Sequence, residues 1–174
     1  MENVMKAEGL APFGEVIRKA GVVFLVGERG RGKTTLLMKF VGILRRRGVE
    51  VGGVLSPRIV RGGETVGYLV RDIADGREEI LCSLEPPGFR FRRFYFRPEG
   101  IEFGRRAILG ATKLPVLVVD EVGPLELTGR GFAPALREAL RERVRESTII
   151  AVRPGLLGEV GSAFGIHGAR IYRI

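Results

Sequence analysis

The chain has 174 residues, and its apolar fraction of 45% is typical of one globular domain with a sizeable core. Its formal net charge of +9 favours contact with polyanions such as nucleotides or nucleic acid. No run of about 18 apolar residues is present and the N-terminus lacks a secretory pattern, so membrane spans and export are not expected. The single cysteine, Cys82, has no internal disulfide partner, which fits a reducing cytoplasm. We therefore expect a cytoplasmic monomer.

The amino-acid usage offers a second explanation for the charge. Glutamine is absent, asparagine occurs only at Asn3, and nearly all the basic residues are arginines. Few thermolabile residues together with many charged ones are typical of proteins from hot environments. The positive charge is thus compatible with a thermophile's surface as well as with an anionic partner.

The first elements in chain order are a strand, a helix and a second strand. Val22–Val26 is a short β-branched run that ends at a glycine, as buried strands often do. Apolar residues at helical spacing predict a helix from Thr34 to Arg47, with cations in its last turn and Gly48 as its stop. Residues 49–57 predict the second strand.

The middle of the chain changes character. Two turn signals, Gly62-Gly63 and Asp75-Gly76, separate strand-like runs, which is typical of antiparallel hairpins. We interpret residues 58–97 as a β-hairpin insertion on one side of the sheet and not as a separate domain. A helix is then expected to begin at Pro98 and to end near Gly110.

The last third again alternates strands with a helix. A helix is expected over residues 131–147, with Leu136, Leu140 and Val144 on its apolar face. Strands are expected at 114–121, 148–154 and 169–174. Continuous apolar strands that alternate with helices predict an α/β fold with three layers and a mostly parallel central sheet. The whole chain, residues 1–174, is predicted to form one domain that carries the 58–97 insertion.

One motif explains the anion preference. The stretch GERGRGKT, Gly27 to Thr34, fits the P-loop pattern G-x-x-x-x-G-K-[ST] between a predicted strand and a predicted helix. Glycines let backbone N–H groups approach a phosphate, and the helix start adds its positive dipole end. Lys33 can reach the β- and γ-phosphates, and the Thr34 hydroxyl can bind Mg²⁺. The residues expected to contact the nucleotide are Gly27, Glu28, Arg29, Gly30, Arg31, Gly32, Lys33, Thr34 and Thr35.

An acidic pair follows the most apolar predicted strand. Asp120 is placed to bind Mg²⁺ as the Walker-B partner of the loop. Side chains alternate along a strand, so Glu121 points elsewhere and is the candidate for activating a water molecule. Glu126 is a second candidate for that role, beyond Gly123-Pro124. The predicted catalytic set is therefore Lys33, Asp120 and Glu121, with Thr34 and Asp120 as metal ligands.

Three segments together carry a more specific resemblance. GERGRGKTT, the hairpin VGGVLSPRIVRGGETVGYLVRDI and LVVDEVGPLEL resemble the thermophile-type nucleoside-triphosphatase family, which includes the vertebrate cancer-related nucleoside-triphosphatase. The resemblance implies a P-loop fold with an added strand between the two motif strands and a catalytic glutamate. It also implies slow, Mg²⁺-dependent hydrolysis of several nucleoside triphosphates to diphosphates.

Two other functions share the same loop. One is a kinase that transfers the phosphoryl group to a nucleoside or metabolite, and the other is a P-loop ATPase stimulated by nucleic acid. The stretch FRFRRFYF, residues 89–96, interleaves aromatic and basic residues, which fits single-strand stacking or a half-buried strand. Four arginines are candidates for contact with the γ-phosphate, none of them favoured over the others: Arg29, Arg31, Arg130 and Arg153. No Asn-Lys-x-Asp motif is present, so broad base tolerance is expected.

Overall fold

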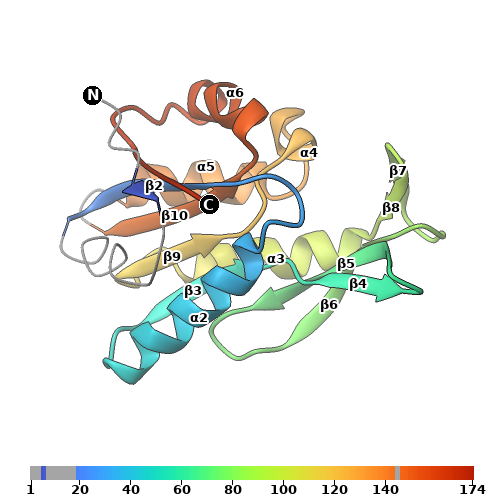
Figure 1. Cartoon of the computed structure of the whole chain (residues 1–174), viewed down its shortest axis with the longest axis horizontal. Helices are drawn as coiled ribbons and strands as arrows, with labels where there is room; N and C mark the ends of the chain where they lie inside the picture. The colour runs from blue at the N-terminus through green and yellow to red at the C-terminus, as the bar shows by residue number, and fades with distance from the viewer. Residues whose placement is uncertain (1–4, 7–18, 144–145) are drawn as a thin grey trace.

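The structure is a computed structural model that describes residues 5–6, 19–143 and 146–174. Its centre is an eleven-stranded sheet in the order β1-β11-β2-β10-β9-β3-β5-β6-β8-β7, with β4 paired to β5 (Figure 1). The parallel part contains β1 (Met5–Lys6), β2 (Gly21–Val26), β3 (Val51–Leu55), β9 (Val116–Val119), β10 (Ser147–Val152) and β11 (Arg170–Arg173). These strands confirm the expected parallel core.

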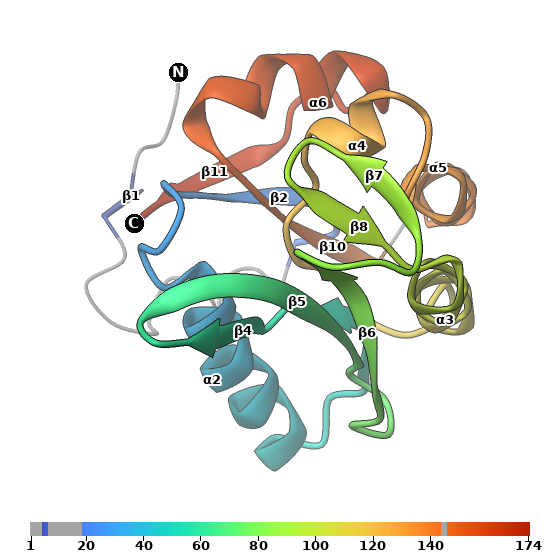
Figure 2. The same cartoon turned by 90° about the vertical axis from the view of Figure 1, so that its right-hand side faces the viewer.

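The predicted insertion forms the antiparallel part of the same sheet. It contains β4 (Arg58–Arg61), β5 (Glu64–Asp72), β6 (Glu78–Ser83), β7 (Phe89–Phe91) and β8 (Phe94–Phe96). β5 pairs with β3, so the insertion continues the sheet beyond its parallel strands (Figure 2). Both turn signals lie between strands, and their glycines, Gly62, Gly63 and Gly76, have the positive φ that such turns require.

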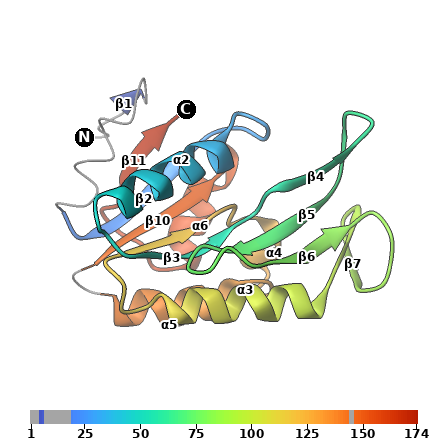
Figure 3. The same cartoon turned by 90° about the horizontal axis from the view of Figure 1, so that it is seen from below.

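Helices cover both faces of the parallel strands. α2 (Lys33–Arg46) lies on one face, while α3 (Pro98–Gly110) and α5 (Ala133–Glu142) run along the other (Figure 3). The sequence of β2 explains this arrangement, because its side chains alternate between the two cores. Val23 and Leu25 pack in the core with α2, and Phe24 and Val26 pack in the core with α3 and α5. The three-layer α/β architecture is therefore confirmed.

The order of the parallel strands bears out one implication of the family resemblance. β10 lies between β2, which leads into the P-loop, and β9, which leads into Asp120. Parallel strands place their carboxyl ends at one edge of the sheet, so the loops after β2, β3, β9 and β10 converge there. That edge carries the site described below.

The helix predicted over residues 131–147 is shorter than expected. α5 ends at Glu142 and Ser147 already begins β10, while the predicted apolar position Val144 lies outside the described residues. Arg143 follows α5 directly, and its buried guanidinium bonds to acceptors that surround the helix end. These acceptors belong to Ala111, Thr112, Leu114, Pro115, Ser147 and Thr148. The chain leaves the helix where this side chain turns inward.

Three short helical segments were not expected from the sequence: α4 (Pro124–Leu127), a 3₁₀ turn (Pro154–Leu156) and α6 (Leu157–Ala163). None is long enough to show helical periodicity clearly. Within the described parts of the chain, no helix combines the length and apolar character needed to cross a membrane.

Candidate functional site

The P-loop connects the end of β2 to the start of α2. Its first glycine is held to the neighbouring strand, because the Gly27 N–H donates to the Val152 carbonyl at 3.2 Å. A Cβ atom at Gly27 would lie only 2.7 Å from Cγ1 of Ile174, so a larger residue would force the Ile174 side chain to shift. Gly32 has φ 88° and opens α2, a conformation that favours glycine. The backbone therefore turns tightly at the point where the sequence predicts a phosphate cradle.

Lys33 is the first residue of α2 and is only 5% exposed. Its ammonium donates to the carbonyls of Gly27 at 2.7 Å and Glu28 at 3.1 Å. It thus lies within the curve of the loop, at the helix end where N–H groups lack intrahelical acceptors. A compact cation beside those donors forms a strong attraction for phosphate oxygens.

Asp120 follows β9 and is completely buried. Its Oδ2 accepts a hydrogen bond from the Ser56 N–H at 3.1 Å, and the Ser56 hydroxyl donates to the Asp120 carbonyl at 3.3 Å. Its Oδ1 has no partner among the described residues. Burial raises the pKa of Asp120 to about 6, against the opposing effects of the Thr34 hydroxyl, the Ser56 N–H and Lys33. An unpartnered buried carboxylate oxygen beside Thr34 suits a hard cation.

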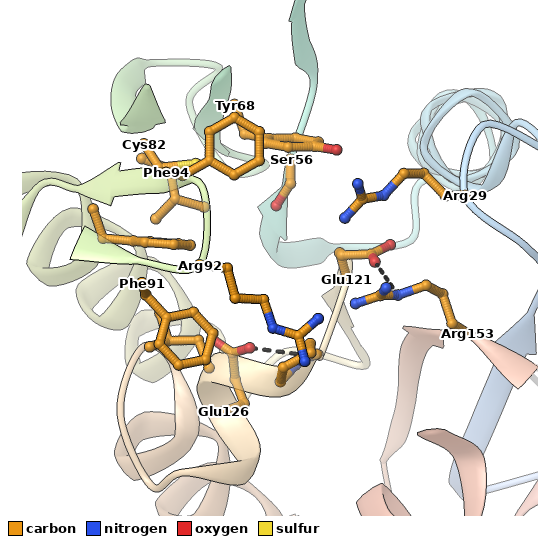
Figure 4. A pocket seen from close by; sticks show the side chains of 15 residues that line it. Arg29, Ser56, Tyr68, Cys82, Phe91, Arg92, Phe94, Glu121, Glu126 and Arg153 are labelled. Atoms are coloured by element: carbon orange, nitrogen blue, oxygen red, sulfur yellow. Dashed lines mark hydrogen bonds and ion pairs between the residues drawn. The ribbon is translucent and has the colours of Figure 1, made fainter. Parts of the chain in front are cut away.

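Glu121 directs its side chain toward two cations. Its carboxylate lies 3.6 Å from the Lys33 ammonium and 3.2 Å from Nε of Arg153 (Figure 4). Glu121 has φ 62°, an uncommon value for a residue with a side chain, and such strain is often found at functional positions. Its side chain is 32% exposed, so water can reach the carboxylate.

Glu126, the second candidate for activating water, occupies a different position. Its two carboxylate oxygens accept hydrogen bonds from the N–H groups of Gly123 and Phe132, each at 3.1 Å. Burial raises its pKa to about 7. Gly131 has φ 58° and lies against Glu126, so it leaves no room there for a side chain. These contacts tie Gly123, just before α4, to Phe132, just before α5, which is a structural role.

The four candidate arginines occupy different positions in the structure. Arg29 and Arg153 face the same space as Glu121 (Figure 4). Arg130 lies over the Phe89 ring, 3.9 Å from its centroid. Arg31 is exposed on the loop. Of the four, only Arg29 and Arg153 line the pocket beside Glu121.

Two adjoining pockets meet at Glu121. The first has a volume of about 250 Å³ and follows the P-loop and the start of α2. It is also lined by Ser56, Arg58 and Tyr68, which the sequence did not single out. Ser56 directly follows the parallel strand β3, and the rule that ligands bind at carboxyl strand ends could have indicated it. Arg58 and Tyr68 come from the insertion and reach the pocket only through the pairing of β4 with β5.

The second pocket, of about 110 Å³, lies beside the first and is largely aromatic. The predicted stretch 89–96 contributes three of its rings, while Arg90, Arg92 and Arg93 are exposed. Phe89 stacks on Phe96 with centroids 5.8 Å apart, and Tyr68 meets Phe94 edge to face at 5.7 Å. The alternation of aromatic and basic residues over 89–96 thus corresponds to a half-buried hairpin, in which the rings contact one another and the arginines are exposed.

A parallel α/β sheet with a strand between its two motif strands, a glycine loop around a lysine and an adjacent buried aspartate define the P-loop class of nucleotide-binding proteins. A family model described as NTPase matches residues 22–159, and the chain belongs to this NTPase family.

Named relatives agree with this membership. The chain is 40% identical over 119 residues to the nucleoside-triphosphatase THEP1 of Thermofilum pendens, a match that covers 67% of this chain and 65% of the relative, slightly under two thirds of its length. It is 32% identical to the protein of that name from Methanopyrus kandleri over 142 residues, which cover 75% of this chain and 79% of the relative.

Solved structures show the same fold. The human cancer-related nucleoside triphosphatase superposes with a TM-score of 0.69 at 25% identity, covering 89% of each chain. THEP1 from Aquifex aeolicus superposes with a TM-score of 0.70 at 19% identity, covering 87% of this chain and 88% of the other.

Proposed function

We propose that this protein hydrolyses nucleoside triphosphates to diphosphates and phosphate, with Mg²⁺ and with broad tolerance of the base. The observation that carries the proposal is the position of Glu121: a partly exposed carboxylate beside the P-loop lysine and next to a buried metal-suited aspartate. Family membership and the names of the relatives support the same reaction.

The nucleotide's phosphates would bind the N–H groups of Gly27 to Thr35, with Glu28, Arg29 and Arg31 carried on the same loop. Lys33 would then exchange its two carbonyl acceptors for β- and γ-phosphate oxygens. Thr34 and Asp120 would hold the metal. Mg²⁺ in this position neutralises charge on the phosphate oxygens during transfer.

Glu121 would accept a proton from a water molecule as the water oxygen attacks the γ-phosphorus. The bond from that phosphorus to the bridging oxygen breaks, and the oxygen leaves with its electron pair on the diphosphate. Arg153 and Lys33 hold the carboxylate from two sides, which fixes its direction. The same cations would offset the charge that gathers on the transferred group.

The first test compares Glu121→Gln with the parent protein in phosphate release from ATP, GTP, CTP and UTP. We expect turnover to fall by roughly 10² or more, the usual effect of losing a general base, while nucleotide binding is retained. Glu102→Gln, at an exposed position of α3, serves as the matched control and should retain turnover. Unchanged turnover in Glu121→Gln would exclude Glu121 as the base.

Two further measurements separate the alternatives. Chelation of Mg²⁺ should abolish phosphate release, and Asp120→Asn should raise the Mg²⁺ concentration needed for half-maximal release. If Glu126→Gln abolished turnover in a protein that still folds and Glu121→Gln did not, the base would be Glu126. Similar rates with all four nucleotides would support broad base tolerance, and a strict preference for one would contradict it.

A further inference from the structure

The aromatic pocket beside Glu121 is larger than hydrolysis requires. A cavity of about 10–15 Å³ already holds one water molecule, whereas this pocket measures about 110 Å³. Four of its lining residues are aromatic: Tyr68, Phe91, Phe94 and Phe96. Aromatic walls offer few hydrogen bonds and orient a water molecule poorly, and unfilled apolar space forfeits packing contacts. The pocket therefore has the character of a site for an organic ligand.

The aromatic pocket adjoins the pocket along the P-loop, which we call the phosphate pocket. Arg29, Ser56, Tyr68 and Glu121 line both of them. Figure 4 shows the Glu121 carboxylate and the guanidinium groups of Arg29 and Arg153 on one side, with the rings of Phe91 and Phe94 across from them. A molecule in the aromatic pocket would thus meet the γ-phosphate from the side on which Glu121 lies.

The volume limits what the occupant can be. An apolar cavity of about 150 Å³ binds one benzene molecule, so about 110 Å³ with an open side leaves room for no more than a single ring and excludes a base with its ribose. Cys82 adds no reactive group, because burial raises the pKa of its thiol to about 12. The lining instead offers ring contacts, the carboxylates of Glu121 and Glu126, and the guanidinium groups of Arg29, Arg92 and Arg153. Of the two carboxylates, only that of Glu121 also lines the phosphate pocket.

We propose that this pocket binds a small single-ring aromatic alcohol whose hydroxyl replaces water as the acceptor of the γ-phosphoryl group. The inference rests on the proposed function, since it uses the same nucleotide and the same Glu121. The alcohol oxygen forms a bond to the γ-phosphorus, the bond to the bridging oxygen breaks, and the diphosphate leaves with the electron pair. Glu121 accepts the hydroxyl proton, so the products are a phosphate monoester and a nucleoside diphosphate.

The test measures how the phosphoryl group divides between water and an added alcohol. Benzyl alcohol, the simplest member of the class, is supplied with Mg·ATP at about 20 mM, a concentration at which millimolar binding approaches saturation. Benzyl phosphate and inorganic phosphate are then quantified by ³¹P NMR. We expect at least tenfold more ester from benzyl alcohol than from ethanol or a nucleoside at the same concentration.

Two variants ask whether the ester arises in the aromatic pocket. Cys82→Leu directs a larger side chain into the pocket, and Phe91→Ala removes one wall from the partly exposed hairpin. Each should lower the ratio of ester to phosphate by about tenfold while phosphate release without alcohol stays within about threefold of the parent. Since Phe91 is only partly buried, its variant remains informative even if Cys82→Leu fails to fold.

Several results would overturn the inference. Phosphate release without ester above the ethanol level would leave the proposed hydrolysis intact and remove the acceptor role. Inhibition of phosphate release by benzyl alcohol without ester would do the same, as would an ester ratio that neither variant changes. Preferential transfer to the nucleoside would exclude a single-ring occupant. Failure of the proposed function itself is distinguishable, because neither phosphate nor ester would then form.

Discussion

Glu126 shows at the scale of one residue how burial and hydrogen bonding compete. Its carboxylate is 6% exposed and receives two backbone N–H groups, which favour the ionised form. Burial nevertheless dominates and raises its pKa from the ordinary 4.5 to about 7. An acid with a raised pKa favours folding when protonated. Its contribution to the free energy of unfolding is complete below pH 4.5 and is lost as pH rises through about 7.

The direction of this pH dependence leads to a prediction for the stability of the whole protein. We expect the free energy of unfolding of the parent protein to fall between pH 4.5 and 7, with Glu126 contributing up to about 3 kcal/mol of the fall. Glu126→Gln should flatten this dependence, leaving the smaller part due to Asp120. Urea unfolding at pH 5, 6, 7 and 8 measures it. The exposed variant Glu102→Gln should retain the full pH dependence, and an equally steep profile in Glu126→Gln would refute the assignment.

The sequence predicts some site residues well because their chemistry depends on local spacing. Gly27 to Thr34 and the pair Asp120 and Glu121 are recognisable from short motifs at strand ends. Ser56 and Tyr68 gain their places only when β3 pairs with β9 and with β5, and no local pattern encodes those pairings. Among many arginines, the sequence could likewise not single out Arg153.

At the scale of elements, Arg143 connects the ends of α3 and α5 to the start of β10. Its guanidinium donates to the carbonyls of Ala111, Thr112 and Leu114 at 2.8 to 2.9 Å, and to that of Ser147 at 2.7 Å. A cation at the C-terminal end of a helix is favoured by the helix dipole. Burial lowers the pKa of Arg143, but a guanidinium remains charged at neutral pH.

We therefore predict that Arg143→Met lowers the free energy of unfolding by roughly 3–5 kcal/mol, because several buried carbonyls lose their donor together. Arg143→Lys should recover part of the loss, since an ammonium carries fewer donors in a less suitable geometry. Denaturant titration measures both. Arg106→Met, at an exposed position of α3, is the control and should change stability by less than about 0.5 kcal/mol. A loss no larger than the control's would show that the buried network adds nothing.

The elements that sequence patterns located best are those with long or continuous apolar faces. The observed bounds of β9 (Val116–Val119) and of α2 differ from the predicted bounds by only a few residues. The end of α5 was predicted too late, because charged residues continue the helical pattern past Glu142 and only the tertiary contacts of Arg143 end it. α4 and α6 are too short for periodicity to mark them.

At the scale of the whole molecule, nucleotide binding should couple to folding, because the cradle is assembled from β2, β3, β9 and α2. A ligand at about 100 times its Kd adds about 2.7 kcal/mol to the free energy of unfolding. For a chain of this length we expect Mg·ADP to raise Tm by roughly 5–10 °C at that saturation. Calorimetric or fluorescence melting measures the shift.

Variants of Lys33 and Asp120 measure how much of that stabilisation depends on the phosphate contacts and how much on Mg²⁺. Lys33→Ala should lose nearly all of the shift, since the buried cation contacts the loop that holds the phosphates. Asp120→Asn should lose the part that depends on Mg²⁺ and keep the rest. Equal shifts in all three proteins would mean that the nucleotide binds elsewhere.

The pairing of β2 has a consequence for how the protein is made. Its two neighbours, β10 and β11, come from the opposite end of the chain, with Ser147 beside Gly21 and Arg170 beside Val23. A ribosome adds the intervening residues in roughly 10 s. The phosphate cradle therefore cannot mature before residues 147–173 have been added, and cellular nucleotide can stabilise only chains that already contain them.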